Sequence, residues 1–151
     1  MNTTNSDVPE GFGPLFRTSP LLDALGPFYG KGAGAELTIG LRVAEKHTNS
    51  RGGVHGGVLA TIGDVALGYT MASSPDRPRS ALTASLTIDY VGSAKVGDWI
   101  EAHVTVQRMG VHLAFASCNL QCGQKLVLRA SGVFAIIQSG AAPPSEDRFD
   151  G

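Results

Sequence analysis

The sequence predicts an α+β domain in which an antiparallel sheet of five to six strands is wrapped around one long central helix. Two observations support this fold class. Five segments have the pattern of strands, and short glycine-containing or polar turns separate the last four of them. One long apolar segment with helical spacing, at about residues 56–72, lies between the first and the second. No regular alternation of strands and helices follows, so a doubly wound parallel sheet is not favoured.

The chain begins with a short helix and a strand. In "SPLLDALGP", Ser19 is suited to the N-cap, Pro20 to the first helical position and Gly26 to the residue that ends the helix. In "AELTIGLRV", residues 35–43, apolar and polar residues alternate with a period of two, which predicts a half-buried strand.

The segment at residues 56–72 has apolar or small side chains on all sides. This pattern predicts a helix that is buried all round. Gly63 and Gly68 each cost about 1 kcal/mol in helix propensity. We therefore expect close packing of the helix backbone at these two positions.

Four further strands are predicted after this helix. Their segments are residues 80–91, 98–109, 113–123 and 125–138. Short breaks separate them at residues 92–97, 110–112 and 123–124. Because such breaks suit hairpins, we expect these strands to form an antiparallel meander.

Composition suggests one domain with loose ends. We expect a flexible N-terminus at residues 1–13, a domain at residues 14–138 and a flexible tail at residues 139–151. With 12 basic and 13 acidic residues and no basic block, we expect no nucleic-acid or membrane partner. No basic leader and no long apolar segment is present, which favours a cytoplasmic protein.

The two cysteines, Cys118 and Cys122, fall in one predicted strand. Four residues of extended chain separate them by about 13 Å, too far for a disulfide. No His or Cys stands nearby at the spacing of metal ligands. We therefore predict free thiols and no metal site.

Asp64 is the single acidic residue between His47 and Pro75. An unpaired carboxylate in such an apolar segment costs several kcal/mol of desolvation unless it finds donors or faces a wet cleft. One hypothesis is a structural Asp that bonds a backbone amide or caps a helical piece after Gly63. The other is a general base or nucleophile at the edge of a cleft.

The start of the same helix favours the catalytic hypothesis. Its free N–H groups and its dipole suit a carbonyl oxygen that becomes negative, and Gly56 and Gly57 allow a substrate carbonyl to approach closely. His55 could orient this turn or bond the substrate carbonyl, and Asn49 could position a water molecule. Taken singly, His55 could equally be a surface histidine and Asn49 a turn-forming residue.

The spacing of Gly56 and Asp64 has a geometric consequence. Eight residues of helix separate them by about 12 Å, more than one carbonyl group can bridge. We therefore predict a two-fold dimer in which the glycine turn of one subunit faces Asp64 of the other.

These residues carry a family resemblance that covers roughly residues 37–137. Asn49, His55, Gly56, Gly57 and Asp64 form a sequence motif, which is followed by the segment "TASLTIDYVGSAKVGD". The motif and this segment together resemble the hotdog-fold acyl-CoA thioesterases of the PaaI-like, phenylacetic acid degradation type. The resemblance implies a hotdog fold, a homodimer or a dimer-of-dimers tetramer, an acyl-CoA or aryl-CoA substrate, and hydrolysis without metal or organic cofactor.

The resemblance also implies roles for individual residues. The Gly56 N–H would polarise the thioester carbonyl, and Asp64 would act as general base or nucleophile from the opposite subunit. Asn49 and His55 would help to hold carbonyl and water. A hydroxyl residue of the next strand would assist the water, and Thr83 or, alternatively, Ser85 fits that place.

Several points stay open at this stage. The acyl group is not identified, although its pocket could be lined by Val58, Ile62 and Tyr69. The candidates for contacts with the CoA phosphates are Arg77, Arg79, Lys95 and Arg108. Two other functions remain as alternatives: a non-catalytic acyl-CoA-binding hotdog module, and a hydratase or dehydratase on the same fold.

Overall fold

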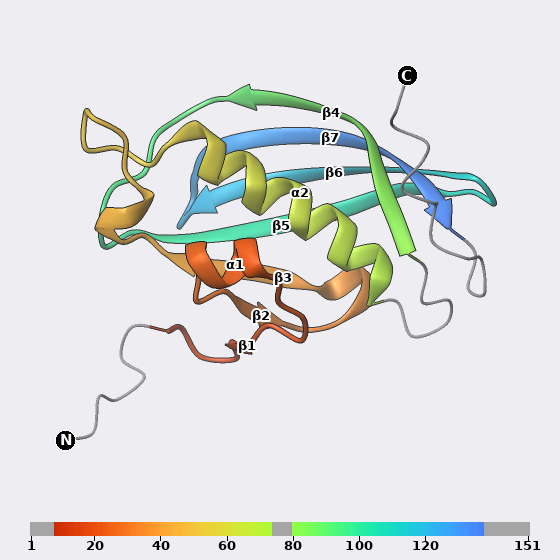
Figure 1. Cartoon of the computed structure of the whole chain (residues 1–151), viewed down its shortest axis with the longest axis horizontal. Coiled ribbons are helices and arrows are strands. Elements are labelled where there is room, and N and C mark those ends of the chain that lie inside the picture. Colours follow the sequence, from red (N-terminus) through yellow and green to blue (C-terminus); the bar gives the residue numbers. More distant parts are fainter. Residues whose placement is uncertain (1–7, 74–79, 138–151) are drawn as a thin grey trace.

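The structure, a computed structural model, describes residues 8–73 and 80–137 (Figure 1). The predicted tail at residues 139–151 and most of the predicted flexible N-terminus lie outside the described residues. The elements in chain order are β1 (Gly13–Pro14), α1 (Pro20–Leu25), β2 (Tyr29–Lys31), η1 (Gly34–Glu36), β3 (Thr38–Arg42), η2 (Glu45–His47), α2 (Gly56–Ala72), β4 (Ser80–Tyr90), β5 (Trp99–Met109), β6 (Leu113–Cys122) and β7 (Lys125–Ile137).

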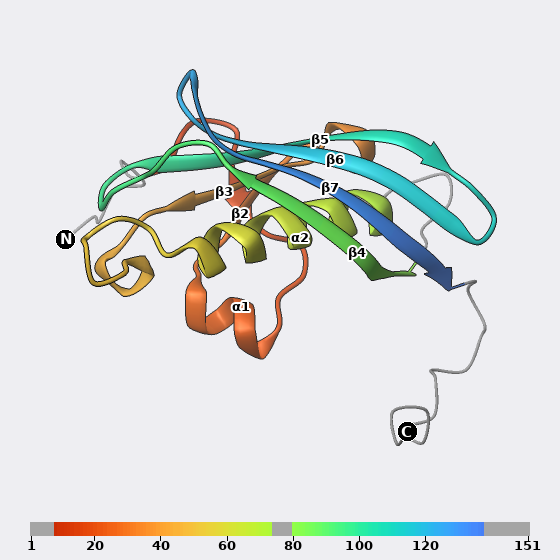
Figure 2. The same cartoon turned by 90° about the horizontal axis from the view of Figure 1, so that it is seen from above.

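All seven strands form one antiparallel sheet in the order β1-β2-β3-β5-β6-β7-β4. The sheet curves around α2, and α1 lies on the side of α2 that faces away from the sheet (Figure 2). The predicted fold class is therefore confirmed. The sheet is wider than expected because β1 and β2, which were not predicted, extend it beyond β3.

The predicted meander is wrong at one connection. β4 pairs with β7 at the edge of the sheet, so β4 and β5 do not form a hairpin. The chain after β4 stays attached to β7, because the N–H groups of Val91 and Gly92 both donate to the Val127 carbonyl. It then crosses the end of the sheet, where the Ala94 carbonyl accepts a hydrogen bond from Val54. Glycine-containing turns suit either connection, so the local sequence could not distinguish them.

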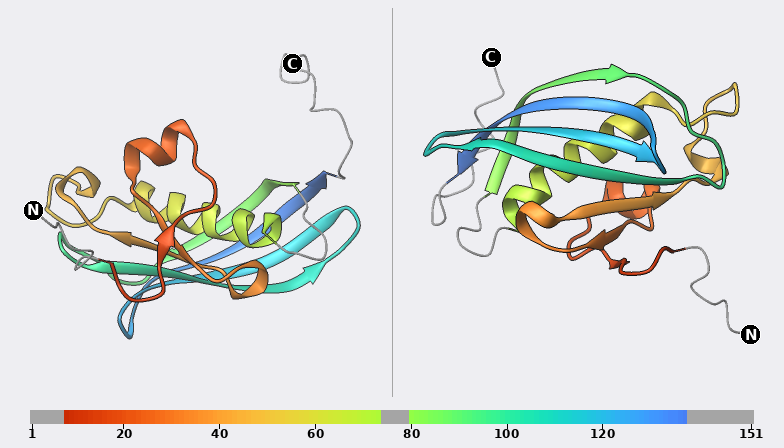
Figure 3. Two further views of the ribbon diagram at one scale, coloured as in Figure 1. Left: turned by 90° about the horizontal axis from the view of Figure 1, so that it is seen from below. Right: turned by 180° about the vertical axis from the view of Figure 1, so that it is seen from behind.

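The bounds of α2 agree with the predicted helix, and those of α1 match its predicted cap residues. The prediction that α2 is buried all round is wrong for the single chain. One side packs on the concave face of the sheet; its buried residues are Val58, Leu59, Ile62, Gly63, Ala66, Leu67, Thr70 and Met71. The opposite side is half-exposed, because the sheet wraps α2 from one direction only (Figure 3).

The two glycines of α2 differ in their surroundings. A Cβ on Gly63 would lie in ordinary contact with Leu128, Ala130 and Leu120, at 3.7–3.9 Å. A Cβ on Gly68 would meet nothing within 4 Å. The expected close backbone packing therefore does not occur at Gly68, which leaves free space on the half-exposed side of the helix.

The part of the N-terminal segment around Phe12 is held against the convex face of the sheet. Phe12 packs edge-on against Trp99 with 5.1 Å between ring centroids. The Trp99 ring also lies so close to Gly40 that a Cβ there would be 2.2 Å from it. Gly40 is therefore required for this ring to lie flat across β3.

Both cysteines are free thiols, as predicted from their spacing. Cys118 faces the core from β6, and burial raises the pKa of its thiol to about 12. Burial also raises the pKa of Cys122, and the nearby Asp98 carboxylate adds to that rise. Both thiols are therefore protonated and weakly nucleophilic at neutral pH. In the described part of the chain, no helix combines the length and the apolarity that crossing a membrane requires.

Candidate active site

The loop before α2 is fixed by a tight turn around Asn49. The Asn49 side-chain oxygen accepts the Arg51 N–H at 2.9 Å, and the Asn49 N–H donates to the Gly53 carbonyl at 2.8 Å. Gly52 completes the turn with a φ of +86°, a conformation that favours glycine. Asn49 is thus a turn-forming residue in this structure, and its side-chain NH2 group has no hydrogen-bond partner among the described residues.

A buried histidine anchors this loop. His47 is 1% exposed, and its Nδ1 accepts the Ala44 N–H at 2.9 Å. This leaves Nε2 as the protonated nitrogen, which donates to the Leu25 carbonyl at the end of α1. The His47 carbonyl accepts the His55 N–H at 2.8 Å. His47 therefore ties α1 to the residue that caps α2.

At the start of α2, the two glycine N–H groups differ. His55 is the N-cap, and its Nδ1 accepts the Gly57 N–H at 2.8 Å. The Gly56 N–H has no hydrogen-bond partner among the residues that the structure describes. One donor therefore remains open at the positive end of a 17-residue helix, the type of site that attracts a negative oxygen.

Tyr90, which the sequence analysis did not single out, holds Gly56 in place. The Tyr90 hydroxyl donates to the Gly56 carbonyl at 2.9 Å. A Cβ on Gly56 would lie 3.1 Å from a ring carbon of Tyr90, so glycine also allows this ring to approach. The only sequence signal for Tyr90 was its place in the segment that carries the family resemblance.

Asp64 lies on the half-exposed side of α2, and its carboxylate has a hydrogen-bond partner. Its Oδ1 accepts a hydrogen bond from the Thr83 hydroxyl at 2.6 Å. Thr83 was the preferred residue for this place, and Ser85 was the alternative. An irregularity in β4 separates the two: Thr83 is opposite the buried Phe134, whereas Ser85 is opposite Val133 and faces the convex side. Ser85 therefore does not face Asp64.

A groove of about 250 Å³ opens beside Asp64. It lies between the half-exposed side of α2, the start of β4 and the N-terminal segment. Its lining residues are Arg17, Asp64, Val65, Gly68, Tyr69, Ala72, Ser80, Ala81, Thr83 and Phe134. Tyr69 was expected to line a pocket and does so, whereas Val58 and Ile62 face the core instead.

One chain does not bring Gly56 and Asp64 together. Gly56 is bonded to Tyr90 near the end of β4, and Asp64 is bonded to Thr83 near its start. Along α2 they are eight residues apart, about 12 Å. The open N–H and the carboxylate are therefore separate features on the surface of one subunit.

The candidates for phosphate contacts are scattered. Lys95 lines a surface depression that also includes Asn49, Arg51 and Lys125. Arg108 is exposed on β5, and Arg77 and Arg79 lie outside the described residues. Among residues 8–73 and 80–137, no three His, Cys, Asp or Glu side chains are grouped as metal ligands would be.

Comparison with known proteins finds a family match, two named relatives and a solved structure of the same fold. Residues 51–128 match the model of the thioesterase superfamily. "Putative esterase PA0474" of Pseudomonas aeruginosa is 52% identical over 129 residues, which cover 85% of this chain and 96% of that protein. Mouse acyl-coenzyme A thioesterase 13 is 32% identical over 85 residues, 56% of this chain and 60% of that protein. The E. coli PaaI structure superposes with a TM-score of 0.72 at 22% identity, over 80% of this chain and 86% of that chain, and shares the fold.

The anchor role of His47 gives a stability prediction. We expect His47→Leu to lower the free energy of unfolding by about 3 kcal/mol, because the part-buried Ala44 N–H and Leu25 carbonyl both lose their partner. His55→Ala removes only an exposed cap bond and should cost about 1 kcal/mol. Urea unfolding of both variants measures the difference. Equal losses would show that His47 does not anchor the loop.

Proposed function

Because the chain belongs to the thioesterase superfamily, we propose that it hydrolyses the thioester bond of an acyl-CoA to give a free acid and CoA. One observation carries this proposal: a carboxylate held by a threonine hydroxyl faces a groove, on the same helix as an open glycine N–H. The two relatives described above, an esterase and an acyl-CoA thioesterase by name, support the same reaction class.

The chemistry needs only these groups. Asp64 acts as general base: Thr83 occupies its Oδ1, and Oδ2 takes a proton from a water molecule. The water oxygen attacks the thioester carbonyl, and the oxygen of the tetrahedral intermediate becomes negative next to the Gly56 N–H. The C–S bond then breaks, CoA leaves as a thiolate, and the proton on Asp64 passes to that thiolate. The same base could also attack directly as a nucleophile, which an isotope experiment in labelled water would distinguish.

The open edge of the sheet supports a shared site. β4 has 11 residues and, among residues 8–73 and 80–137, pairs only with β7, so no other described strand lies beside its outer backbone groups. It contains no proline, and its only charged residue is Asp89. A long, nearly uncharged edge is a template for another strand, whereas the opposite edge is closed by the two-residue β1. We propose that β4 pairs with β4 of a second copy.

Antiparallel pairing of two copies about a two-fold axis allows several registers, and one of them would bring the two half-sites together. α2 and β4 run in opposite directions, with Gly56 at Tyr90 and Asp64 at Thr83. If the axis passes through Thr87, Ser85 of one chain is opposite Asp89 of the other. Beyond the irregularity between Thr83 and Ser85, Thr83 then comes opposite the partner's Tyr90.

This register would complete the site. It sets the carboxylate of one subunit beside the open N–H of the other, across the Thr83 and Tyr90 side chains that hold them. It also creates two equivalent sites per dimer. The half-exposed side of α2 would be covered by the partner, which accounts for its small and apolar residues.

The role of Asp64 can be separated from a structural role. We expect Asp64→Asn to lower the rate of acyl-CoA hydrolysis by about 100-fold or more, because the amide keeps the size but cannot accept the proton. The melting temperature should change little. Asp89→Asn, on the convex face of β4, is the matched control and should keep full activity. A lowered melting temperature with an unchanged rate for Asp64→Asn would mean that Asp64 is structural.

The register of the proposed dimer can be tested by cross-linking. We expect Thr87→Cys subunits to form a disulfide-linked dimer under mild oxidation, because the two Thr87 positions would be directly opposite each other. Ser85→Cys is the control on the same strand and face. Its two copies would be offset by four residues, about 13 Å, and should not cross-link. A dimer with Ser85→Cys but not with Thr87→Cys would disprove this register.

A further inference from the structure

The groove beside Asp64 has room for an acyl group but not for a whole CoA molecule. Its volume of about 250 Å³ is below the usual range for drug-sized ligands, about 300–1,000 Å³. Asp64, Gly68 and Ala72 are spaced by four residues, so they form one stripe on α2. Because Gly68 and Ala72 are small, this stripe leaves space directly beyond the carboxylate. An acyl chain whose carbonyl is held at Asp64 would extend along this stripe.

The groove carries a positive charge as well as the negative charge of Asp64. Among its described lining residues, Asp64 and Arg17 are the only charged ones. The Arg17 guanidinium lies 5.7 Å from the centre of the Tyr69 ring and 5.6 Å from that of Phe16. Tyr69 follows Asp64 by five residues, about 7.5 Å along the helix axis. Along the helix axis, the residue whose ring Arg17 contacts is therefore offset from Asp64 by roughly the length of a short acyl chain.

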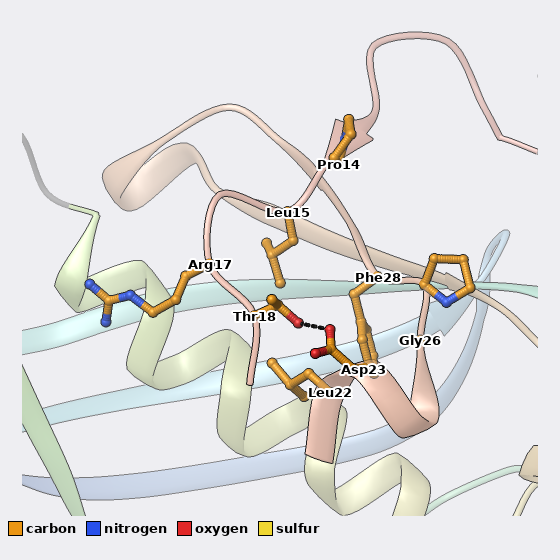
Figure 4. Close-up of a pocket in the computed structure, with 9 residues that line it drawn as sticks. Pro14, Leu15, Arg17, Thr18, Leu22, Asp23, Gly26 and Phe28 are labelled. Carbon is orange, nitrogen blue, oxygen red and sulfur yellow. Dashed lines mark hydrogen bonds between the residues drawn. The ribbon is translucent and has the colours of Figure 1, made fainter. Parts of the chain in front are cut away.

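No carboxylate of the described residues neutralises Arg17. Within residues 8–73 and 80–137, the ion pairs are those of Glu101 with His103 and Asp89 with Arg129. The neighbouring Asp23 accepts a hydrogen bond from Thr18 instead. Figure 4 shows this bond beside Phe28 in an adjoining pocket, which Arg17 also lines, and it shows the Arg17 guanidinium pointing away from the Thr18–Asp23 bond and across α2.

Resting on the proposed function, we infer that the groove binds the acyl part of the substrate and that Arg17 binds a carboxylate at its far end. The substrate class is then the CoA monothioesters of short dicarboxylic acids. A guanidinium binds a carboxylate through two parallel hydrogen bonds, and stacking on two rings holds Arg17 in position before the ligand arrives. This arrangement also keeps the Asp64 carboxylate away from the free carboxylate of the substrate, because Asp64 faces the thioester and Arg17 faces the free acid.

Binding measurements on the inactive Asp64→Asn protein test this inference without requiring hydrolysis. The matched probes are adipyl-CoA and hexanoyl-CoA, which have the same chain length and differ in the terminal carboxylate. We expect adipyl-CoA to bind about tenfold more tightly by calorimetry, because a charge-assisted hydrogen bond is gained. Adding Arg17→Gln should remove this difference by weakening adipyl-CoA alone.

Two further variants control for charge and for location. Arg42→Gln removes an arginine that also stacks on an aromatic ring, that of Trp99, but lies on the other face of the sheet. It should leave the preference for adipyl-CoA unchanged. Gly68→Leu fills the groove and should weaken both probes by about tenfold, with a much smaller effect on acetyl-CoA.

The outcomes separate this inference from the proposed function. Equal affinity for adipyl-CoA and hexanoyl-CoA would overturn it, even if the wild type hydrolyses both. Equal weakening of both probes by Arg17→Gln would also overturn it, because Arg17 would then bind the CoA phosphates or support the fold. If the wild type hydrolyses no acyl-CoA but the preference for adipyl-CoA is present, the inference about binding holds and the proposed reaction is wrong.

Discussion

The account depends on one constraint: α2 and β4 lie side by side, run in opposite directions and are joined at two points. The Tyr90 hydroxyl holds the first residue of α2, and the Thr83 hydroxyl holds Asp64 two turns later. Both bonds connect the one long helix to the edge strand of the sheet. As a result, the groups that thioester hydrolysis requires, an N–H donor and a base, are both fixed but are about 12 Å apart. A second copy paired through the same edge strand would bring them together.

The surrounding structure holds these two points in place. The buried His47 attaches the loop before α2 to the end of α1, and His55 occupies the Gly57 N–H so that only the Gly56 N–H stays open. The irregularity in β4 turns Thr83 towards the helix, whereas Ser85 faces the other side of the sheet. The side of α2 that the sheet does not cover keeps Gly68 free of neighbours, and the groove beside Asp64 results from this.

The sequence predicted the features that local chemistry controls. Cap residues predicted the ends of α1, the glycine pair and the helical spacing of apolar residues predicted α2, and the periodicity of β4 to β7 predicted their positions. The sequence could not predict the strand order, because the break after Tyr90 suits a hairpin and a crossover equally well. Thr83 and not Ser85 faces Asp64 because of an irregularity in β4, and no residue in that segment indicates this irregularity. Tyr90 and Arg17 were missed for a similar reason: each acts through a contact with a residue far away in the chain, Gly56 or Tyr69.

Activity of mixed dimers tests most directly whether each site is shared. Gly56→Pro removes the open N–H, and proline is tolerated at the first position of a helix after a residue in the extended conformation of His55. Gly56→Ala adds a Cβ towards Tyr90 but keeps the N–H, so it controls for crowding. Differently tagged Asp64→Asn and Gly56→Pro subunits, each inactive alone, are co-expressed and purified as the mixed dimer. A shared site predicts about half of the wild-type rate, because one of the two sites carries neither change. A mixed dimer of verified composition without activity would show that Asp64 and Gly56 act within one chain.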